Sequence, residues 1–147
     1  MFRFLGLDKG DMWKKSIKML EYKYGYNEAH VAVLVSIVDQ KMYVIAGNEI
    51  KRIFLVSTSR YGYSSRKIED KTTPLGVFKI DALSRDWIKI QGVEGKLLSK
   101  TLLIRPTEDD AILGKRETEG SDILLSVKDY EVLCSFVKNN TIVNIQL

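Results

Sequence analysis

The sequence supplies few residues for nucleophilic catalysis. It has one cysteine, Cys134, and one histidine, His30, and the two share no recognisable motif. A thiolate nucleophile needs a neighbouring base, most often histidine, that lowers its pKa and takes its proton. Cysteine–histidine chemistry is therefore hard to build here. We interpret Cys134 as a buried structural thiol on the apolar face of a predicted helix, and His30 as a surface residue that precedes a strand.

The sequence also lacks a clear metal-binding pattern. A structural zinc site needs about four Cys or His ligands, and no such cluster is present. The only acidic run, at residues 108–110, is short and more typical of a solvated loop than of a cation site. We therefore expect neither a metal nor a cofactor.

Composition indicates one globular domain. The 147 residues are 45% hydrophobic and 29% charged, which is enough apolar sequence for a real core. No apolar run reaches the roughly 18 residues of a membrane span, and the first nine residues are too short and too soon charged for a signal peptide. We predict no membrane span, and no export signal is visible.

The charge is basic but dispersed. A net charge of +4 would suit an anionic partner, yet basic and acidic residues are interleaved along the chain. Even the densest basic stretch, residues 60–71, contains Glu69 and Asp70. This pattern favours a solvated surface over a nucleic-acid interface, so we expect no nucleic-acid partner.

The hydrophobic pattern predicts a helix followed by three strands. Asp11 can cap a helix with apolar residues at three-to-four spacing, which Gly25 ends. Residues 31–45 are β-branched and apolar apart from a break at 39–41, and a further strand at 50–58 follows a Gly-Asn turn. We expect an antiparallel meander with both faces largely buried.

The second half predicts a long loop, more short strands and a helix. Residues 59–73 lack periodicity, and loops of this length are often functional. Expected elements after it are a turn at 74–76, strands at 77–82, 87–91 and 101–104, a helix that Ser126 caps and Asn139-Asn140 stops, and a last strand at 141–145.

Three segments carry a family resemblance. They read V-L-V-S-I-V-D-Q-K-M-Y-V at 33–44, F-L-V-S-T-S at 54–59 and K-T-T-P-L-G-V-F-K-I at 71–80. Their order and spacing resemble the catalytic domain of L,D-transpeptidases, the YkuD-like fold. The resemblance implies a mainly β domain with flanking helices (α+β): a β-sandwich-type domain over residues 31–147 with a C-terminal helix, preceded by an N-terminal helical extension over residues 1–30.

The residues that the family uses for catalysis are replaced. Its H-G-T segment corresponds to Arg105-Pro106-Thr107. Its S-H-G-C-I-R-M-S segment leads directly into a helix and can be aligned backwards from Ser126. That register puts Gly120 at the histidine position, Asp122 at the nucleophilic cysteine and Leu124 at the arginine. The resemblance thus implies a degenerate site.

A second register places a hydroxyl at the nucleophile position. Thr107 and Ser121 are 14 residues apart (121 − 107), close to the family's threonine-to-cysteine spacing. Ser121 would then replace the cysteine and Glu119 the histidine. We favour the first register because residue spacing next to a helix varies less than the length of a loop. If Ser121 attacked a carbonyl, Glu119 would have to act as base without an imidazole.

Arg105 brings a fixed cation into this region. It can pair with Asp122 or Glu119 and fill the former cleft, or it can bind a ligand carboxylate beside Thr107 and Ser121. The sequence alone leaves both interpretations open.

Three functions from different classes follow. The first is a non-catalytic binding or regulatory module for peptidoglycan stem peptides or for a protein partner. The second is an active cell-wall transpeptidase or peptidase with a rearranged nucleophile, Ser121 or else Cys134. The third is an adaptor, immunity or assembly protein on a borrowed fold. The resemblance suggests an extracytoplasmic location.

Overall fold

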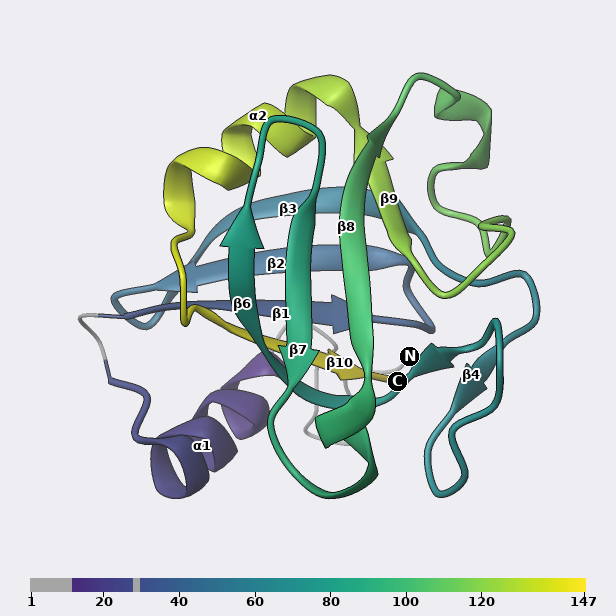
Figure 1. Ribbon diagram of the computed structural model, residues 1–147. Helices are drawn as coiled ribbons and strands as arrows, with labels where there is room; N and C mark the ends of the chain where they lie inside the picture. Colours follow the sequence, from purple (N-terminus) through teal and green to yellow (C-terminus); the bar gives the residue numbers. More distant parts are fainter. Residues whose placement is uncertain (1–11, 28–29) are drawn as a thin grey trace, which may run out of the picture.

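A computed structural model describes residues 12–27 and 30–147, and these form a β-barrel with two packed helices (Figure 1). The helices are α1 (Met12–Tyr24) and α2 (Val127–Phe136). The barrel strands are β1 (Val31–Ser36), β2 (Lys41–Ala46), β3 (Glu49–Ser57), β6 (Gly76–Leu83), β7 (Ile88–Gly92), β8 (Thr101–Thr107), β9 (Ile123–Ser126) and β10 (Ile142–Gln146). The described residues also form a short sheet of β4 (Tyr63–Ser64) and β5 (Thr73–Pro74) and two 3-10 turns (Gly95–Ser99 and Asp110–Ile112).

The eight barrel strands close in the order β1-β10-β6-β7-β8-β9-β3-β2. Two neighbouring pairs, β1 with β10 and β8 with β9, are parallel, and the others are antiparallel. The predicted mainly β fold with flanking helices is confirmed, and its strands form one closed sheet instead of the two sheets of a sandwich. Closure leaves no strand of this sheet with an unpaired edge.

Strand β9 is the one barrel strand that the sequence did not predict. Its four residues lie between β8 and β3, with Leu124 opposite Arg105 on one side and Ser57 on the other. Strand β8 also runs three residues beyond its predicted end and includes Arg105, Pro106 and Thr107. A strand this short shows too little alternation to be recognised, because its pairing depends on neighbours that are distant in sequence.

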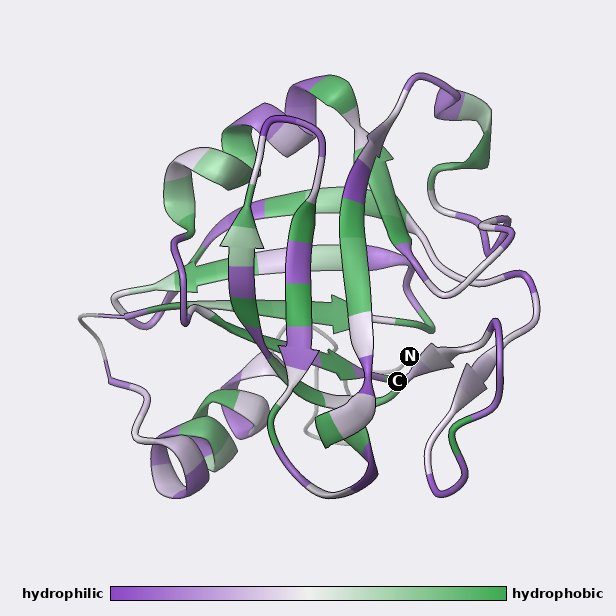
Figure 2. Ribbon diagram, in the orientation of Figure 1, coloured by the Kyte–Doolittle hydropathy of each residue, from purple (hydrophilic) through white to green (hydrophobic). Residues whose placement is uncertain are grey.

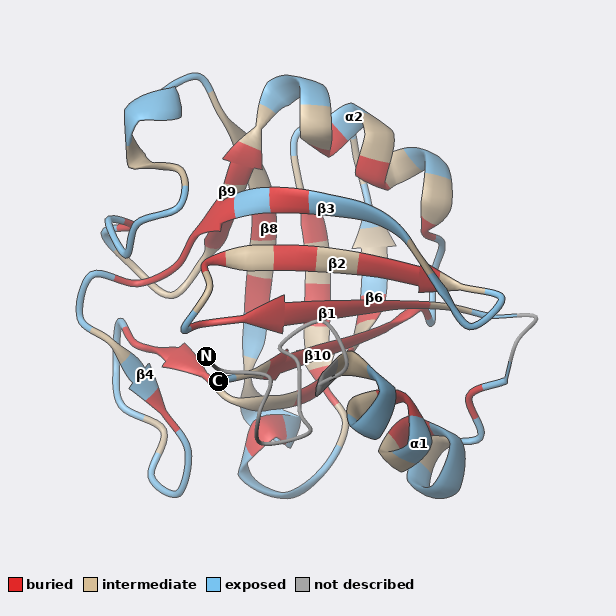
Figure 3. Ribbon diagram, turned by 180° about the vertical axis from the view of Figure 1, so that it is seen from behind, coloured by how far each residue is buried: buried red, intermediate tan, exposed pale blue. Residues whose placement is uncertain are grey.

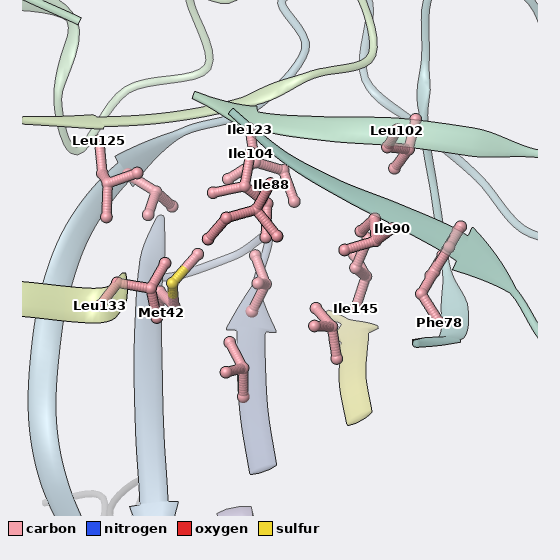
Figure 4. Close-up of a cluster of buried hydrophobic side chains, with 14 of the residues drawn as sticks. Met42, Phe78, Ile88, Ile90, Leu102, Ile104, Ile123, Leu125, Leu133 and Ile145 are labelled. Carbon is pink, nitrogen blue, oxygen red and sulfur yellow. The ribbon is translucent and has the colours of Figure 1, made fainter. Parts of the chain in front are cut away.

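The barrel interior forms the main hydrophobic core. Figure 4 shows side chains from opposite strands meeting there, among them Met42, Phe78 and Ile104. Helix α2 adds Tyr130 and Leu133 to this cluster. The helix begins as predicted, because the Ser126 hydroxyl accepts a hydrogen bond of 3.0 Å from the Asp129 amide. The hydropathy colours of Figure 2 follow the same arrangement, with the apolar residues concentrated in the strands.

A second hydrophobic cluster lies outside the barrel. Ile17 and Leu20 of α1 pack against Ala32, Leu34 and Ile142, and Figure 3 shows α1 lying beside β1 and β10. Strand β1 is therefore buried on both faces, as predicted. The prediction was wrong for β3, where Ile53 and Leu55 point outward and are 53% and 47% exposed.

Helix α1 ends as predicted at Gly25, whose φ of 70° lies in the left-handed region that glycine tolerates. The expected cap at Asp11 falls outside the described residues. In the described part of the chain, no helix has both the length and the apolar character needed to cross a membrane. The division into residues 1–30 and 31–147 stays a prediction.

Candidate functional site

The predicted site residues lie where β8 and β9 run side by side. The parallel register aligns Arg105 with Leu124 and Thr107 with Ser126. Residues 108–122 connect the two strands and return the chain to the start of β9. The structure therefore brings the two predicted halves of the site together, although they are separated in sequence.

Asp122 is bound on both carboxylate oxygens. Its Oδ2 lies 3.0 Å from Arg105 Nε, and its Oδ1 accepts a hydrogen bond of 3.1 Å from the Leu103 amide. The Arg105 and Asp122 side chains are 43% and 28% exposed, so the pair is only partly screened by water. Of the two pairings that the sequence allowed for Arg105, the structure contains the one with Asp122. The carboxylate thus links the start of β9 to β8.

Glu119 and Ser121 do not form a base–nucleophile pair. Glu119 Oε1 instead lies 2.7 Å from Arg60 Nη1, in an exposed ion pair that raises the pKa of Arg60. The Ser121 side chain is half-buried, and its hydroxyl makes no hydrogen bond within residues 12–27 and 30–147. Proton transfer from Ser121 to Glu119 would require both side chains to move.

The other three predicted positions carry no reactive contact. A Cβ added at Gly120 would meet no atom within 4 Å, so this position has room for a side chain. The Thr107 hydroxyl accepts a hydrogen bond of 3.1 Å from the Asp109 amide at the start of the connecting loop. Leu124, which the favoured register aligns with the family's arginine, is half-buried on β9.

Buried polar side chains form a hydrogen-bond network next to Glu119, and these residues were not among the predicted site residues. Thr118 Oγ1 lies 3.0 Å from both the carbonyl oxygen and the hydroxyl of Ser57. Gln40 donates to Thr58 Oγ1 at 2.7 Å and accepts from the Thr58 amide at 2.9 Å. All four side chains are buried. Gln40, Ser57 and Thr58 lie in the segments that carried the family resemblance, which was the available signal.

The loop predicted at residues 59–73 borders the same region. Ser59 forms a parallel bridge with Thr118, and this contact fixes the loop beside the connecting segment. Tyr61 is 51% exposed, with the Arg60 guanidinium 6.0 Å and the Lys71 ammonium 5.6 Å from its ring centre. The result is an exposed aromatic ring between two cations.

The lone cysteine and histidine lie away from these residues. Cys134 is half-buried and packs against the barrel core, and burial raises the pKa of its thiol. A raised pKa lowers the thiolate fraction, which makes Cys134 a poor nucleophile. His30 precedes β1, and its Nδ1 accepts a hydrogen bond of 3.4 Å from the Asn27 amide.

In the part of the chain that the structure describes, no three His, Cys, Asp or Glu side chains lie close enough together to hold a metal ion. The acidic run at residues 108–110 is exposed. Asp109 caps a short turn by accepting a hydrogen bond of 3.2 Å from the Ala111 amide.

Comparison with known proteins gives matches at the level of structure alone. No family model matches the chain, and no curated protein matches it. An L,D-transpeptidase from Mycobacterium smegmatis aligns with a TM-score of 0.61 at 14% identity, over 81% of this chain and 59% of that one. L,D-transpeptidase 3 from Mycobacterium tuberculosis, in complex with a faropenem-derived adduct, aligns with a TM-score of 0.59 at 15% identity, over 80% and 60%.

A third solved structure, the L,D-transpeptidase (residues 123–326) from Xylanimonas cellulosilytica, has a TM-score of 0.59 at 13% identity, over 86% of this chain and 68% of that one. This chain spans about three fifths of the length of the two mycobacterial structures. At such identities the likeness concerns the fold, and it agrees with the barrel and the helix positions described above. The chain has the fold of the L,D-transpeptidases.

Proposed function

We propose that this chain is a non-catalytic protein on the L,D-transpeptidase fold that binds peptidoglycan stem peptides without reacting with them. The observation that carries the proposal is Asp122. In the favoured register it stands where the nucleophile belongs, and both of its oxygens are occupied by Arg105 and the Leu103 amide. A carboxylate held in this way braces two strands and is not available to attack a carbonyl.

The surrounding residues support the loss of chemistry. Acyl transfer needs a nucleophile, a base that takes its proton, and donors that stabilise the developing oxyanion. Glu119 is bound to Arg60, and the burial-raised pKa of Cys134 keeps its thiol protonated. Ser121 remains as a candidate nucleophile, but its predicted base, Glu119, is bound to Arg60.

The surface next to Glu119, whose carboxylate pairs with Arg60, supports binding. Arg60, Tyr61 and Lys71 form an exposed cationic and aromatic surface on the loop at residues 59–73. Stem peptides carry carboxylates, which arginine and lysine bind through charge-assisted hydrogen bonds. The structurally similar proteins are named L,D-transpeptidases, which favours a peptide from the cell wall as the ligand over an unrelated anion.

Titration with a synthetic tetrapeptide stem tests the proposal. We expect saturable binding without turnover, and a Kd about tenfold higher in the Arg60→Ala, Lys71→Ala double variant. Lys128→Ala removes a charge from the exposed first turn of α2 and serves as the matched control, with unchanged affinity. Hydrolysis or transpeptidation of the peptide would contradict the proposal, as would the absence of binding, which would favour a protein partner instead.

A specific observation keeps a second function open to test. The Ser121 side chain is half-buried, and no hydrogen bond within the described ranges engages its hydroxyl. An active enzyme of this kind would form an ester with an acylating β-lactam, and Ser121→Ala would abolish that ester.

A further inference from the structure

A pocket of about 690 Å³ lies away from the candidate site, at the place where both helices end. Its walls come from three parts of the chain: residues 24–26 and 30–31 around the end of α1, Lys79 on β6, and residues 136 and 138–142 around the end of α2. None of the predicted site residues from 105 to 124 lines it. The volume falls in the range of about 300–1,000 Å³ that is usual for small-molecule sites.

Aromatic side chains form much of the apolar wall. Tyr24 and Tyr26 come from the end of α1, and Phe136 comes from the last turn of α2. The Arg52 guanidinium lies 5.3 Å from the centre of the Phe136 ring. This contact helps to fix the orientation of the ring. A ligand with an apolar or aromatic body would fit against these rings.

The polar wall has two lysines without a counter-ion in the described residues. Neither Lys79 nor Lys138 forms an ion pair or a side-chain hydrogen bond there. Asp81, two residues beyond Lys79 on β6, pairs with Lys89 at 3.4 Å, and Glu94 accepts a hydrogen bond from the hydroxyl of the lining residue Tyr24. Among the lining residues that the structure describes, none is acidic.

The helix ends reduce this positive charge but do not cancel it. The carboxyl ends of α1 and α2 both reach the pocket, and each carries a partial charge of about −0.5. Two full positive charges therefore exceed the two partial negative ones. Asn139 and Asn140 add side-chain amide donors at the turn into β10, where Asn140 has a φ of 72°.

We propose that this pocket binds a small molecule that carries a doubly charged oxyanion on an apolar body. The two ammonium groups would neutralise the dianion, the asparagine amides would donate hydrogen bonds to its oxygens, and the aromatic wall would cover the body of the ligand. This site is separate from the Asp122 region, and the proposal does not depend on the peptide-binding function proposed above.

Amide-resolved NMR titration of the full chain with phenyl phosphate at low salt tests the inference. We expect saturable shifts concentrated at residues 24–26 and 138–142, with affinity decreasing from phenyl phosphate to benzoate to phenol. Shifts confined to residues 60–71 would place the anion on the other cationic surface and overturn the inference. Equal affinity for phenol would overturn it too, because the pocket would then recognise only the apolar body.

Charge variants provide the second arm. The Lys79→Gln, Lys138→Gln double variant should raise the Kd for phenyl phosphate at least about tenfold, with an unchanged melting temperature to show that the fold is intact. Lys128→Gln lies at the other end of α2 and should leave the Kd unchanged. An unaltered Kd in the double variant, or equal weakening in Lys128→Gln, would refute the proposal.

Discussion

Residues 118–122 are held by two different kinds of contact at their two ends. Thr118 is 3% exposed and makes neutral hydrogen bonds to Ser57 beneath the surface. Glu119 and Asp122 make ion pairs with Arg60 and Arg105 in partly or fully solvated positions. One end therefore belongs to the frame of the barrel, whereas the other end lies at the surface where the family resemblance expects chemistry.

The difference indicates which of these positions are constrained by folding. A buried hydrogen-bonding group that loses its partner costs stability directly, so substitutions at Thr118 or Ser57 are constrained by folding. Positions at the exposed end bear on folding mainly through partly screened charges. Gly120 and Asp122 lie at that end, where side chains can change without disrupting the barrel.

The largest expected effect is at the buried end. Thr118→Val keeps the shape of the side chain but removes its hydroxyl, which leaves the Ser57 groups without that partner. We expect a loss of about 2 kcal/mol in the free energy of unfolding, measured by urea denaturation. Thr107→Val, at a half-buried position with one hydrogen bond, is the matched control and should cost about 0.5 kcal/mol. Equal losses of unfolding free energy in Thr118→Val and Thr107→Val would contradict the claim that the buried hydroxyl of Thr118 contributes more to stability.

An intermediate effect is expected at Asp122, because it makes both an ion pair and a hydrogen bond to a backbone amide. Asp122→Ala removes the Arg105 ion pair and the acceptor for the Leu103 amide, and should cost about 1.5 kcal/mol in urea denaturation. Asp122→Asn keeps an acceptor for that amide and should recover roughly half of the loss. If Asp122→Asn were as destabilising as Asp122→Ala, the stabilising contribution of Asp122 would depend on its charge alone.

The smallest effect is expected at the exposed pair. Both Glu119→Ala and Arg60→Ala should shift the melting temperature by no more than about 2 °C, because solvated ion pairs contribute little and are screened by salt. The difference from the native chain should vanish in 1 M salt. A larger shift that persists in salt would mean that Glu119 has a structural role comparable to that of Thr118.

The fold was largely predictable because its signals are local. Alternating and continuous apolar runs marked β1, β2, β3 and β6, and the Ser126 cap marked the start of α2. Closure into a barrel was not predictable, because it depends on the parallel pairing of β8 with β9 and of β1 with β10 between segments far apart in the sequence. The four residues of β9 are a strand only because β8 and β3 lie on either side of them.

The sequence indicated that Arg105 could pair with Asp122 or with Glu119, and only the structure distinguishes the two pairings. That these residues form a functional site stays a prediction. Arg60 was not considered as the partner of Glu119, since the two residues are 59 positions apart. The pocket at the helix ends was also beyond sequence reasoning, because three distant stretches contribute to it.

The central claim is that the site has lost its acylation chemistry, and intact-mass spectrometry with faropenem tests it most directly. L,D-transpeptidase 3 from Mycobacterium tuberculosis, which has been observed with a faropenem-derived adduct, is the positive control. We predict that the native chain keeps its unmodified mass under conditions in which the control is fully labelled. A stoichiometric adduct on the native chain that is absent from Ser121→Ala would contradict the account and identify Ser121 as a working nucleophile.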